Sequence, residues 1–168
     1  MKLKDNLVVG LLFSLALVIA FAAWANEEGD YLGPKAKVVE NLFKLGQLAR
    51  ERKLPILLIA TQDYCSHCDL LKEEIIQPML ISGDYEDRVI IREILLDSEE
   101  RIPDFSGTLR RQADIADEYN VWVTPTLLYI DGNGKQVAET MLGVNSLDYY
   151  GYYVDESIAK GLEVIRQQ

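Results

Sequence analysis

Both cysteines and the single histidine of this 168-residue chain lie in one stretch, Pro55-Ile56-Leu57-Leu58-Ile59-Ala60-Thr61-Gln62-Asp63-Tyr64-Cys65-Ser66-His67-Cys68. Residues 56–60 form an unbroken apolar run, which predicts a strand buried on both faces of a parallel or mixed sheet. The apolar residues after Cys65 recur at helical spacing and are Leu70, Leu71, Ile75, Ile76 and Met79. The sequence therefore predicts that Cys65 and Cys68 lie where a strand passes into the N-terminus of a helix.

The start of a helix is a favourable position for a reactive sulfur. Unpaired backbone N–H groups and the positive end of the helix dipole favour an anion there. The predicted position should therefore favour the thiolate form of Cys65. Cys68 falls one helical turn later on the same face, where it can close a small disulfide with Cys65. A purely structural disulfide is the alternative, although so short a ring removes little entropy from the unfolded chain.

The same residues argue against a bound metal or haem. A structural zinc site needs four ligands, and the chain has no second pair of cysteines or histidines. Covalent haem needs a histidine directly after the second cysteine, and Asp69 stands there. We therefore expect no metal and no cofactor apart from a redox-active disulfide between Cys65 and Cys68.

The segment Tyr64-Cys65-Ser66-His67-Cys68 after an apolar strand resembles the active site of the thioredoxin superfamily. A second segment, Val121-Trp122-Val123-Thr124-Pro125-Thr126-Leu127-Leu128-Tyr129-Ile130, resembles the part of that family that carries a cis-proline. The resemblance covers about residues 35–167 and is closest to exported bacterial thioredoxin-like proteins. It implies an α/β thioredoxin fold, a central mixed sheet of about four strands flanked by helices on both faces.

The pattern of apolar, charged and small residues divides the chain into three parts. Residues 1–25 have a basic start, an apolar run and the small-residue pattern Ala23-Trp24-Ala25, which predicts a secretory signal peptide and a periplasmic location. An uncleaved anchor in the inner membrane, facing the periplasm, is the alternative because the apolar run is nearly long enough to span a bilayer. Residues 26–33 are expected to be a flexible lead-in, and residues 34–168 a thioredoxin-like domain.

Charge narrows the range of partners. The formal net charge is −10, and it becomes −11 once residues 1–25, with two lysines and one aspartate, are removed. An acidic chain of this kind is unsuited to nucleic acid and to anionic membrane surfaces. We expect a monomer without stable membrane association after cleavage.

The remaining elements are predicted from periodicity and turn residues. Helices are expected over residues 34–53, 110–119 and 146–166, and strands over 89–96, 125–130 and 136–142. Pro78 should kink or end the helix that begins at Cys65. Residues 98–112 are predicted to form a polar connection that is longer than its counterpart in thioredoxins.

The resemblance implies thiol–disulfide exchange with protein substrates. Cys65 would attack a partner disulfide as a thiolate, and Cys68 would then resolve the mixed disulfide. An unidentified redox partner would return the two cysteines to their starting redox state. The alternative function is a binding or structural module of the same fold whose Cys65–Cys68 bond stays closed.

Further residues receive roles from the same resemblance. Substrate contacts are expected from Tyr64, Ser66, Thr124 and Pro125. His67 resembles the histidine of the more oxidising family members, where its N–H groups stabilise the first thiolate. A solvent-exposed spacer is the alternative for His67, and a trans-proline opening an edge strand is the alternative for Pro125.

One departure from the family concerns a proton acceptor. Thioredoxins resemble one another in a buried acid six residues before the first active-site cysteine, and this chain has Ile59 there. Glu93 falls on the strand expected beside 56–60, and strand alternation places it with the apolar Ile91 and Leu95. We predict that Glu93 serves as a displaced base. The alternative is a solvated or arginine-paired surface glutamate.

The first testable prediction concerns export. The cleavage pattern ends at Ala25, so N-terminal sequencing of the exported protein should begin at Asn26. Recovery of the full-length chain in the membrane fraction would contradict cleavage and favour the anchored form.

Overall fold

The computed structural model describes residues 35–167. The expected signal peptide (1–25) and lead-in (26–33) lie outside the described residues. Within 35–167, none of the helices combines the length and the apolar character needed to cross a membrane.

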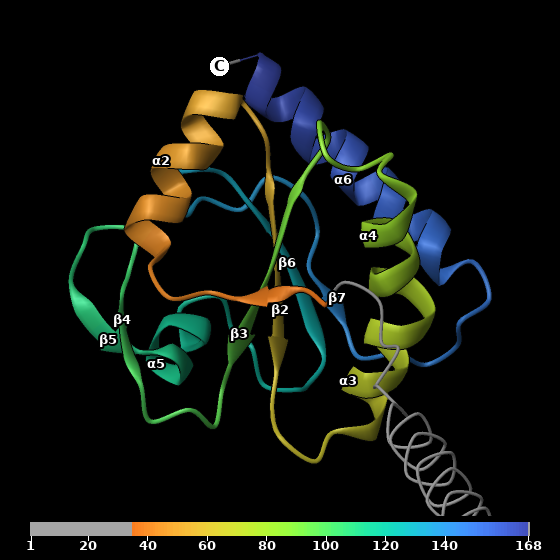
Figure 1. The fold of residues 1–168 in the computed structure, drawn as a ribbon, viewed down its shortest axis with the longest axis horizontal. Coiled ribbons are helices and arrows are strands. Elements are labelled where there is room, and N and C mark those ends of the chain that lie inside the picture. Colours follow the sequence, from red (N-terminus) through yellow and green to blue (C-terminus); the bar gives the residue numbers. More distant parts are fainter. Residues whose placement is uncertain (1–34, 168) are drawn as a thin grey trace, which may run out of the picture. The chain divides into compact units, whose positions relative to one another are not determined.

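A five-stranded mixed sheet forms the centre of the domain (Figure 1). Its middle strand is β2 (Ile56–Thr61), which pairs in parallel with β3 (Ile90–Leu95) and antiparallel with β6 (Thr126–Ile130). The outer strands are β1 (Lys37–Val38), parallel to β3, and β7 (Met141–Leu142), antiparallel to β6. All six residues of β2 are buried, which confirms the strand predicted from the apolar run.

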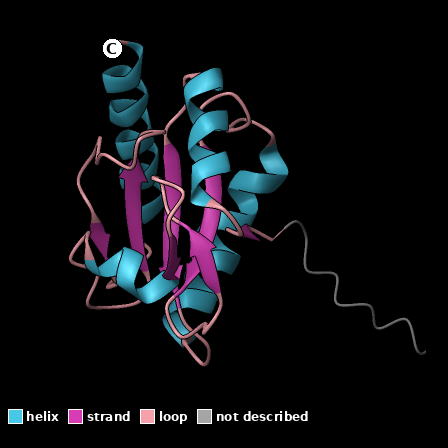
Figure 2. Ribbon diagram, turned by 90° about the vertical axis from the view of Figure 1, so that its left-hand side faces the viewer, coloured by secondary structure: helices cyan, strands magenta, loops and turns pink. Residues whose placement is uncertain are grey.

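Helices cover both faces of this sheet (Figures 1 and 2). One face carries α2 (Leu42–Arg52) and α5 (Gln112–Asp117). The other carries α3 (Ser66–Leu71), α4 (Gln77–Ser82) and α6 (Tyr150–Arg166). The mixed α/β thioredoxin fold is therefore confirmed, with one strand more than expected.

Strand alternation divides the core into two layers. On the α2 side, Leu58 and Ala60 of β2 belong to one buried apolar cluster. On the α3 side, Leu57 and Ile59 of β2 belong to a second cluster. A strand that is apolar on both faces is the local requirement for this three-layer arrangement.

The extra strand corrects the predicted helix over 34–53. Lys37 and Val38 pair with β3, and the helix begins only after Asn41. The side-chain Oδ1 of Asn41 accepts a hydrogen bond from the backbone N–H of Lys44 at 2.9 Å. Such a cap satisfies one of the free N–H groups at a helix start and fixes where the helix begins. The prediction ran past this cap because adjacent valines fit helical as well as strand spacing.

Pro78 does not end the active-site helix. Between α3 and α4 lies a π-helical turn, η1 (Lys72–Ile76), and the Gln77 N–H bonds to the Lys72 carbonyl five residues back. Proline cannot donate a hydrogen bond, and its ring crowds the carbonyl four residues earlier. The wider turn just before Pro78 accommodates this, so the chain stays helical to Ser82.

The connection over 98–112 contains two strands that its polar composition did not predict. Its strands β4 (Arg101–Pro103) and β5 (Leu109–Arg111) form a separate antiparallel pair. In the turn between them, Asp104 Oδ1 accepts hydrogen bonds from the backbone N–H groups of Ser106 and Thr108. The helix predicted over 110–119 is consequently shorter, since residues 110 and 111 belong to β5.

The predicted strand over 136–142 and the predicted closing helix are also shorter than expected. Gln136 makes an isolated bridge to Ile130, and regular pairing resumes only at Met141 and Leu142. Between them, the side-chain amide of Gln136 donates a hydrogen bond to the Ala138 carbonyl at 2.8 Å. Helix α6 starts at Tyr150 rather than at residue 146.

A second prediction follows from the contact of α2 with the turn after β6. A Cβ atom added to Gly46 would collide with the carbonyl oxygen of Gly132, and one added to Gly132 would collide with that of Gly46. Because both clashes involve backbone, Gly46→Ala should lower the free energy of unfolding by about 1–3 kcal/mol in urea denaturation.

Gly151→Ala is the matched control. Its Cβ would meet only Ile75 Cδ1 at 3.7 Å, an ordinary contact in the first turn of α6. Alanine favours a helix over glycine by up to about 1 kcal/mol, so this variant should be as stable as the parent or more stable. If Gly46→Ala were as stable as the parent, α2 could move away from the turn without any loss in the free energy of unfolding.

Candidate active site

The junction of β2 with α3 positions the two cysteines. Cys65 is the N-cap of α3, and its sulfur accepts a hydrogen bond from the Cys68 N–H at 3.2 Å. The two sulfurs form a disulfide of 2.03 Å, with Cα atoms 5.2 Å apart. Capping places Cys65 Sγ directly at the free N–H groups of the helix, where a negative charge is stabilised.

The two sulfurs differ in their access to solvent. Cys65 is partly exposed, whereas Cys68 is fully buried at 0% exposure. A second molecule can therefore reach Cys65 far more readily than Cys68. This difference favours Cys65 as the attacking residue and Cys68 as the resolving residue.

The residues around Cys65 are strongly exposed. Tyr64 has a positive φ of 55° and a fully exposed side chain. Ser66 and His67 are also exposed, in the first turn of α3. A bulky residue rarely adopts positive φ, and such conformations cluster at functional sites. The loop thus presents an aromatic ring, a hydroxyl and an imidazole to solvent.

The second motif meets the first across the sheet. Thr124 Oγ1 lies 3.6 Å from Cys65 Sγ, although the two residues are 59 positions apart. The peptide bond between Thr124 and Pro125 is cis. The two segments singled out in the sequence therefore form one site at the ends of β2 and β6.

A buried tyrosine supports the Pro125 loop. The Pro125 carbonyl accepts a hydrogen bond from the Gly143 N–H at 2.8 Å, and the Gly143 carbonyl accepts one from the Tyr150 hydroxyl at 2.9 Å. Burial raises the pKa of Tyr150 to about 12, because the phenolate would lose its hydration. Tyr150 therefore remains a protonated donor and ties the loop to α6. Neither Gly143 nor Tyr150 was expected at the site.

Trp122 is a further residue that sequence reasoning did not assign. Its side chain is 77% exposed, two residues before Thr124. Tryptophan is enriched at protein–protein contacts, so the exposed indole is a candidate contact residue. The sequence signal that could have identified Trp122 was its position inside the segment 121–130, two residues before Thr124.

Glu93 is buried and held by hydrogen bonds. Only 7% of the residue is exposed, and its Oε1 accepts a hydrogen bond from the Thr61 hydroxyl at 2.6 Å. The Lys72 ammonium lies 3.4 Å from the same oxygen and 3.3 Å from Asp69 Oδ1. The solvated or arginine-paired alternative is therefore wrong: the cation is a lysine from the active-site helix.

Neither partner of Glu93 was foreseen. Arg92, its neighbour along β3, donates to its own strand at the Ile91 carbonyl, and its burial lowers the pKa of the guanidinium. Lys72 could have been noticed because it stands four residues after Cys68, on the same helix face.

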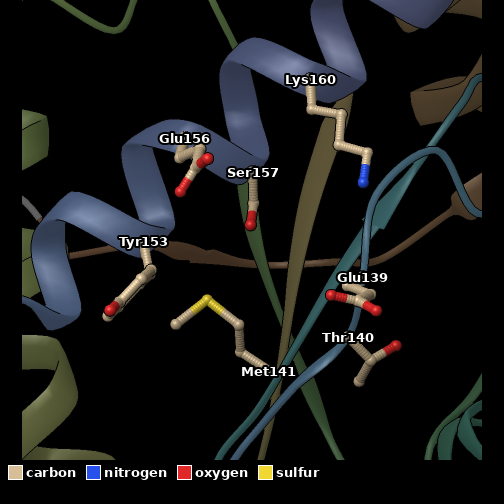
Figure 3. A pocket seen from close by; sticks show the side chains of 7 residues that line it. All are labelled: Glu139, Thr140, Met141, Tyr153, Glu156, Ser157 and Lys160. Carbon is tan, nitrogen blue, oxygen red and sulfur yellow. The ribbon is translucent and has the colours of Figure 1, made fainter.

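A separate pocket of about 380 Å³ lies between α6 and the segment that ends in β7 (Figure 3). Its lining residues are Glu139, Thr140, Met141, Tyr153, Glu156, Ser157 and Lys160. The set includes neither cysteine and none of the residues predicted for the site. The chemistry of the disulfide is therefore carried by the surface around Cys65 and not by this pocket.

The fold and the Cys-x-x-Cys pair at a helix start define the class of thioredoxin-like oxidoreductases. A sequence profile described as a thioredoxin-like domain matches residues 45–154. This match spans more than half of the chain, so the protein belongs to the thioredoxin-like domain family.

One solved structure supports the fold, and a second has a lower similarity score. A DsbH oxidoreductase shares 17% sequence identity over 79% of this chain and 91% of that one, with a TM-score of 0.57. Oxidised thioredoxin O2 from Arabidopsis thaliana shares 19% identity over 73% and 95%, with a TM-score of 0.49. A search of curated proteins gave no match.

A third prediction concerns His67, at the second position of α3. His67→Pro removes a donor beside Cys65 and should make the protein more reducing, measured by equilibrium with glutathione. The expected shift is some tens of millivolts, since about 30 mV corresponds to about 1.4 kcal/mol for two electrons. His67→Gln, which keeps a neutral donor, should shift less. An unchanged equilibrium in His67→Pro would mean that His67 is only a spacer.

Proposed function

We propose that this protein is an exported thiol–disulfide oxidoreductase that exchanges the Cys65–Cys68 dithiol or disulfide with protein substrates. The observation that carries the proposal is a disulfide with one accessible sulfur at a helix N-terminus, next to Thr124. These features are what nucleophilic exchange requires: an anion-stabilising position, access for a partner and a resolving thiol.

In the reducing direction, the Cys65 thiolate attacks one sulfur of a client disulfide. A Cys65–client bond forms, and the other client sulfur leaves with the electron pair and takes up a proton. Cys68 then attacks Cys65 Sγ, closes the internal disulfide and releases the second client sulfur. The oxidising direction runs through the same mixed disulfide in reverse, and a separate redox partner resets the pair.

Client binding is assigned to the exposed surface around Cys65. Tyr64 and Ser66 flank the sulfur, and Thr124 and Pro125 lie across from it on the neighbouring loop. An extended client backbone can lie along this loop while Trp122 adds apolar contact area. His67 supplies N–H groups that stabilise the thiolate released in each cycle.

A closed structural module is the second candidate, and it is compatible with the disulfide in the structure. The sequence separation of 3 makes the bond a weak staple for the unfolded chain, which favours the redox role. Turnover of a dithiol or disulfide substrate separates the two functions.

The proposed location is the periplasm, with a cleaved signal peptide over residues 1–25 and a monomeric mature chain. Inner-membrane anchoring is the alternative. Both rest on the sequence pattern. The acidic charge favours protein thiols and disulfides as partners over nucleic acid.

The fourth prediction separates the roles of the two cysteines. Cys65→Ser should abolish exchange, because no accessible thiolate remains. Cys68→Ser should accumulate mixed disulfides with a disulfide-bonded client, visible on non-reducing gels, because only the resolving step is lost. Faster alkylation of Cys68 than of Cys65 in the reduced parent would show that the roles are reversed.

A further inference from the structure

The pocket between α6 and β7 contains a sulfur atom that the disulfide chemistry does not use. Met141 lines this pocket, and its side chain extends from its strand toward α6 (Figure 3). The charged side chains of Glu139, Glu156 and Lys160 line it as well, so water and small polar solutes can enter. Hydrogen peroxide is little larger than a water molecule, which occupies about 30 Å³ in the liquid, and the pocket measures about 380 Å³.

A buried phenol holds the sulfur of Met141 in place. The Tyr129 hydroxyl donates a hydrogen bond to Met141 Sδ at 3.2 Å, and Tyr129 is fully buried. Burial raises the pKa of this phenol, because the phenolate would lose its hydration, so Tyr129 remains a donor. Among residues 35–167, no second group hydrogen-bonds to this sulfur. A thioether has two lone pairs, and the one that Tyr129 does not occupy is free to attack an oxidant.

Met79 provides a comparison within the same protein. Residues 35–167 contain two methionines, Met79 and Met141, and both pack in the apolar layer between the sheet and α6. Met79 is buried, with 7% of the residue exposed, whereas Met141 is partly exposed and lines the pocket. A dissolved oxidant reaches a partly exposed thioether more readily than a buried one. Met141 is therefore the more reactive of the two.

The strand that carries Met141 also supports the loop opposite the disulfide. Met141 is the first of the two residues of β7, and both pair with β6. The residue that follows β7, Gly143, donates its backbone N–H to the Pro125 carbonyl at 2.8 Å. Thr124, the residue before Pro125, lies 3.6 Å from Cys65 Sγ. A displacement of Met141 is thus passed along two residues of chain to the loop beside the reactive sulfur.

We propose that Met141 is an oxidant-sensitive modification site, where a hydroperoxide forms methionine sulfoxide and thereby loosens the Pro125 loop; the effect on exchange rests on the proposed function. With hydrogen peroxide, the free lone pair of Met141 Sδ attacks one peroxide oxygen, so that an S–O bond forms and the O–O bond breaks. The other oxygen leaves with the electron pair and takes up the proton of the transferred hydroxyl, which gives water. The thioether is oxidised and the peroxide is reduced by the same electron pair.

Oxidation changes what the buried phenol can bind. The sulfur of a sulfoxide is electron-poor, so the hydrogen bond from Tyr129 to Met141 Sδ weakens, and a buried donor without an acceptor is costly. The new oxygen is the stronger acceptor, but it lies on the side of the sulfur away from Tyr129. The side chain of Met141 must turn to bring this oxygen to the phenol. Because β7 has only two residues, little strand pairing opposes that movement.

The fifth prediction tests Met141 in the disulfide form of the protein, where neither Cys65 nor Cys68 carries a thiolate that peroxide could oxidise. Hydrogen peroxide should add one oxygen atom to Met141 at least about tenfold faster than to Met79, measured by mass spectrometry of the peptides. Oxidation of Met79 at the same rate as Met141 would overturn the assignment of the site.

Hydrogen exchange of the Gly143 amide reports the loop directly, because this N–H is bonded to the Pro125 carbonyl. Its exchange should become about tenfold faster or more after oxidation, while the amides of β2 keep their protection. Treatment with reductases for both sulfoxide epimers should restore the slow exchange. Met141→Leu keeps an apolar side chain without an oxidisable sulfur, so peroxide should leave its Gly143 amide unchanged. Unchanged Gly143 exchange in the oxidised parent would overturn the link to the loop.

Exchange is measured after the peroxide has been removed and the disulfide reduced. The oxidised parent should reduce a disulfide-bonded peptide about fivefold more slowly or less, because the loop no longer positions the peptide, and the reductases should restore the rate. Met141→Leu should keep its rate after peroxide treatment. Equal rates for the parent before and after oxidation would overturn the regulatory effect. Absence of exchange by the untreated parent would instead overturn the proposed function, and oxygen uptake at Met141 with Gly143 exchange would still decide whether the modification site exists.

Discussion

The antiparallel register of β2 with β6 is the constraint on which the site depends. Ala60 pairs with Thr126, so the chain leaving β2 and the chain entering β6 meet at the same end of the sheet. Cys65 follows five residues after Ala60, and Thr124 precedes Thr126 by two, which brings Sγ and Oγ1 to 3.6 Å. A one-residue slip between the two strands would move Thr124 along the sheet relative to Cys65 and turn the side chains of one strand to the other face. The register thus fixes the site as well as the core.

The sequence was sufficient for the parts of the molecule that follow from strong local patterns. The unbroken run over 56–60 predicted the central strand, and the two motifs predicted which loops would meet. The failures have local causes. Asn41 caps a helix that periodicity alone extended too far, and Asp104 organises a hairpin within a polar segment. The short strand β1 depends on a partner distant in sequence, β3, and no pattern of two residues can specify that pairing.

The environment of Glu93 shows the same limit of prediction from sequence. Alternation correctly placed it among apolar neighbours on β3. Its hydrogen bond to Thr61 and its ion pair with Lys72 join three separate elements and required coordinates. With Ile59 in register beside it, the position that carries an acid in thioredoxins is apolar here, and the carboxylate stands one strand away. The buried carboxyl group that contacts Lys72 therefore comes from β3 and not from β2.

The shortness of the two outer strands has a consequence for the proposed exchange with other protein chains. β1 and β7 each contain two residues, so the borders of the sheet offer few free backbone groups in a row. Long exposed borders recruit foreign strands and lead to aggregation, and short ones resist this. In the proposed exchange with protein clients, this protects the protein against adding a client to its own sheet. The proposal then leaves the loops around the sulfur as the place where a client docks, and from which it is released once its bond is exchanged.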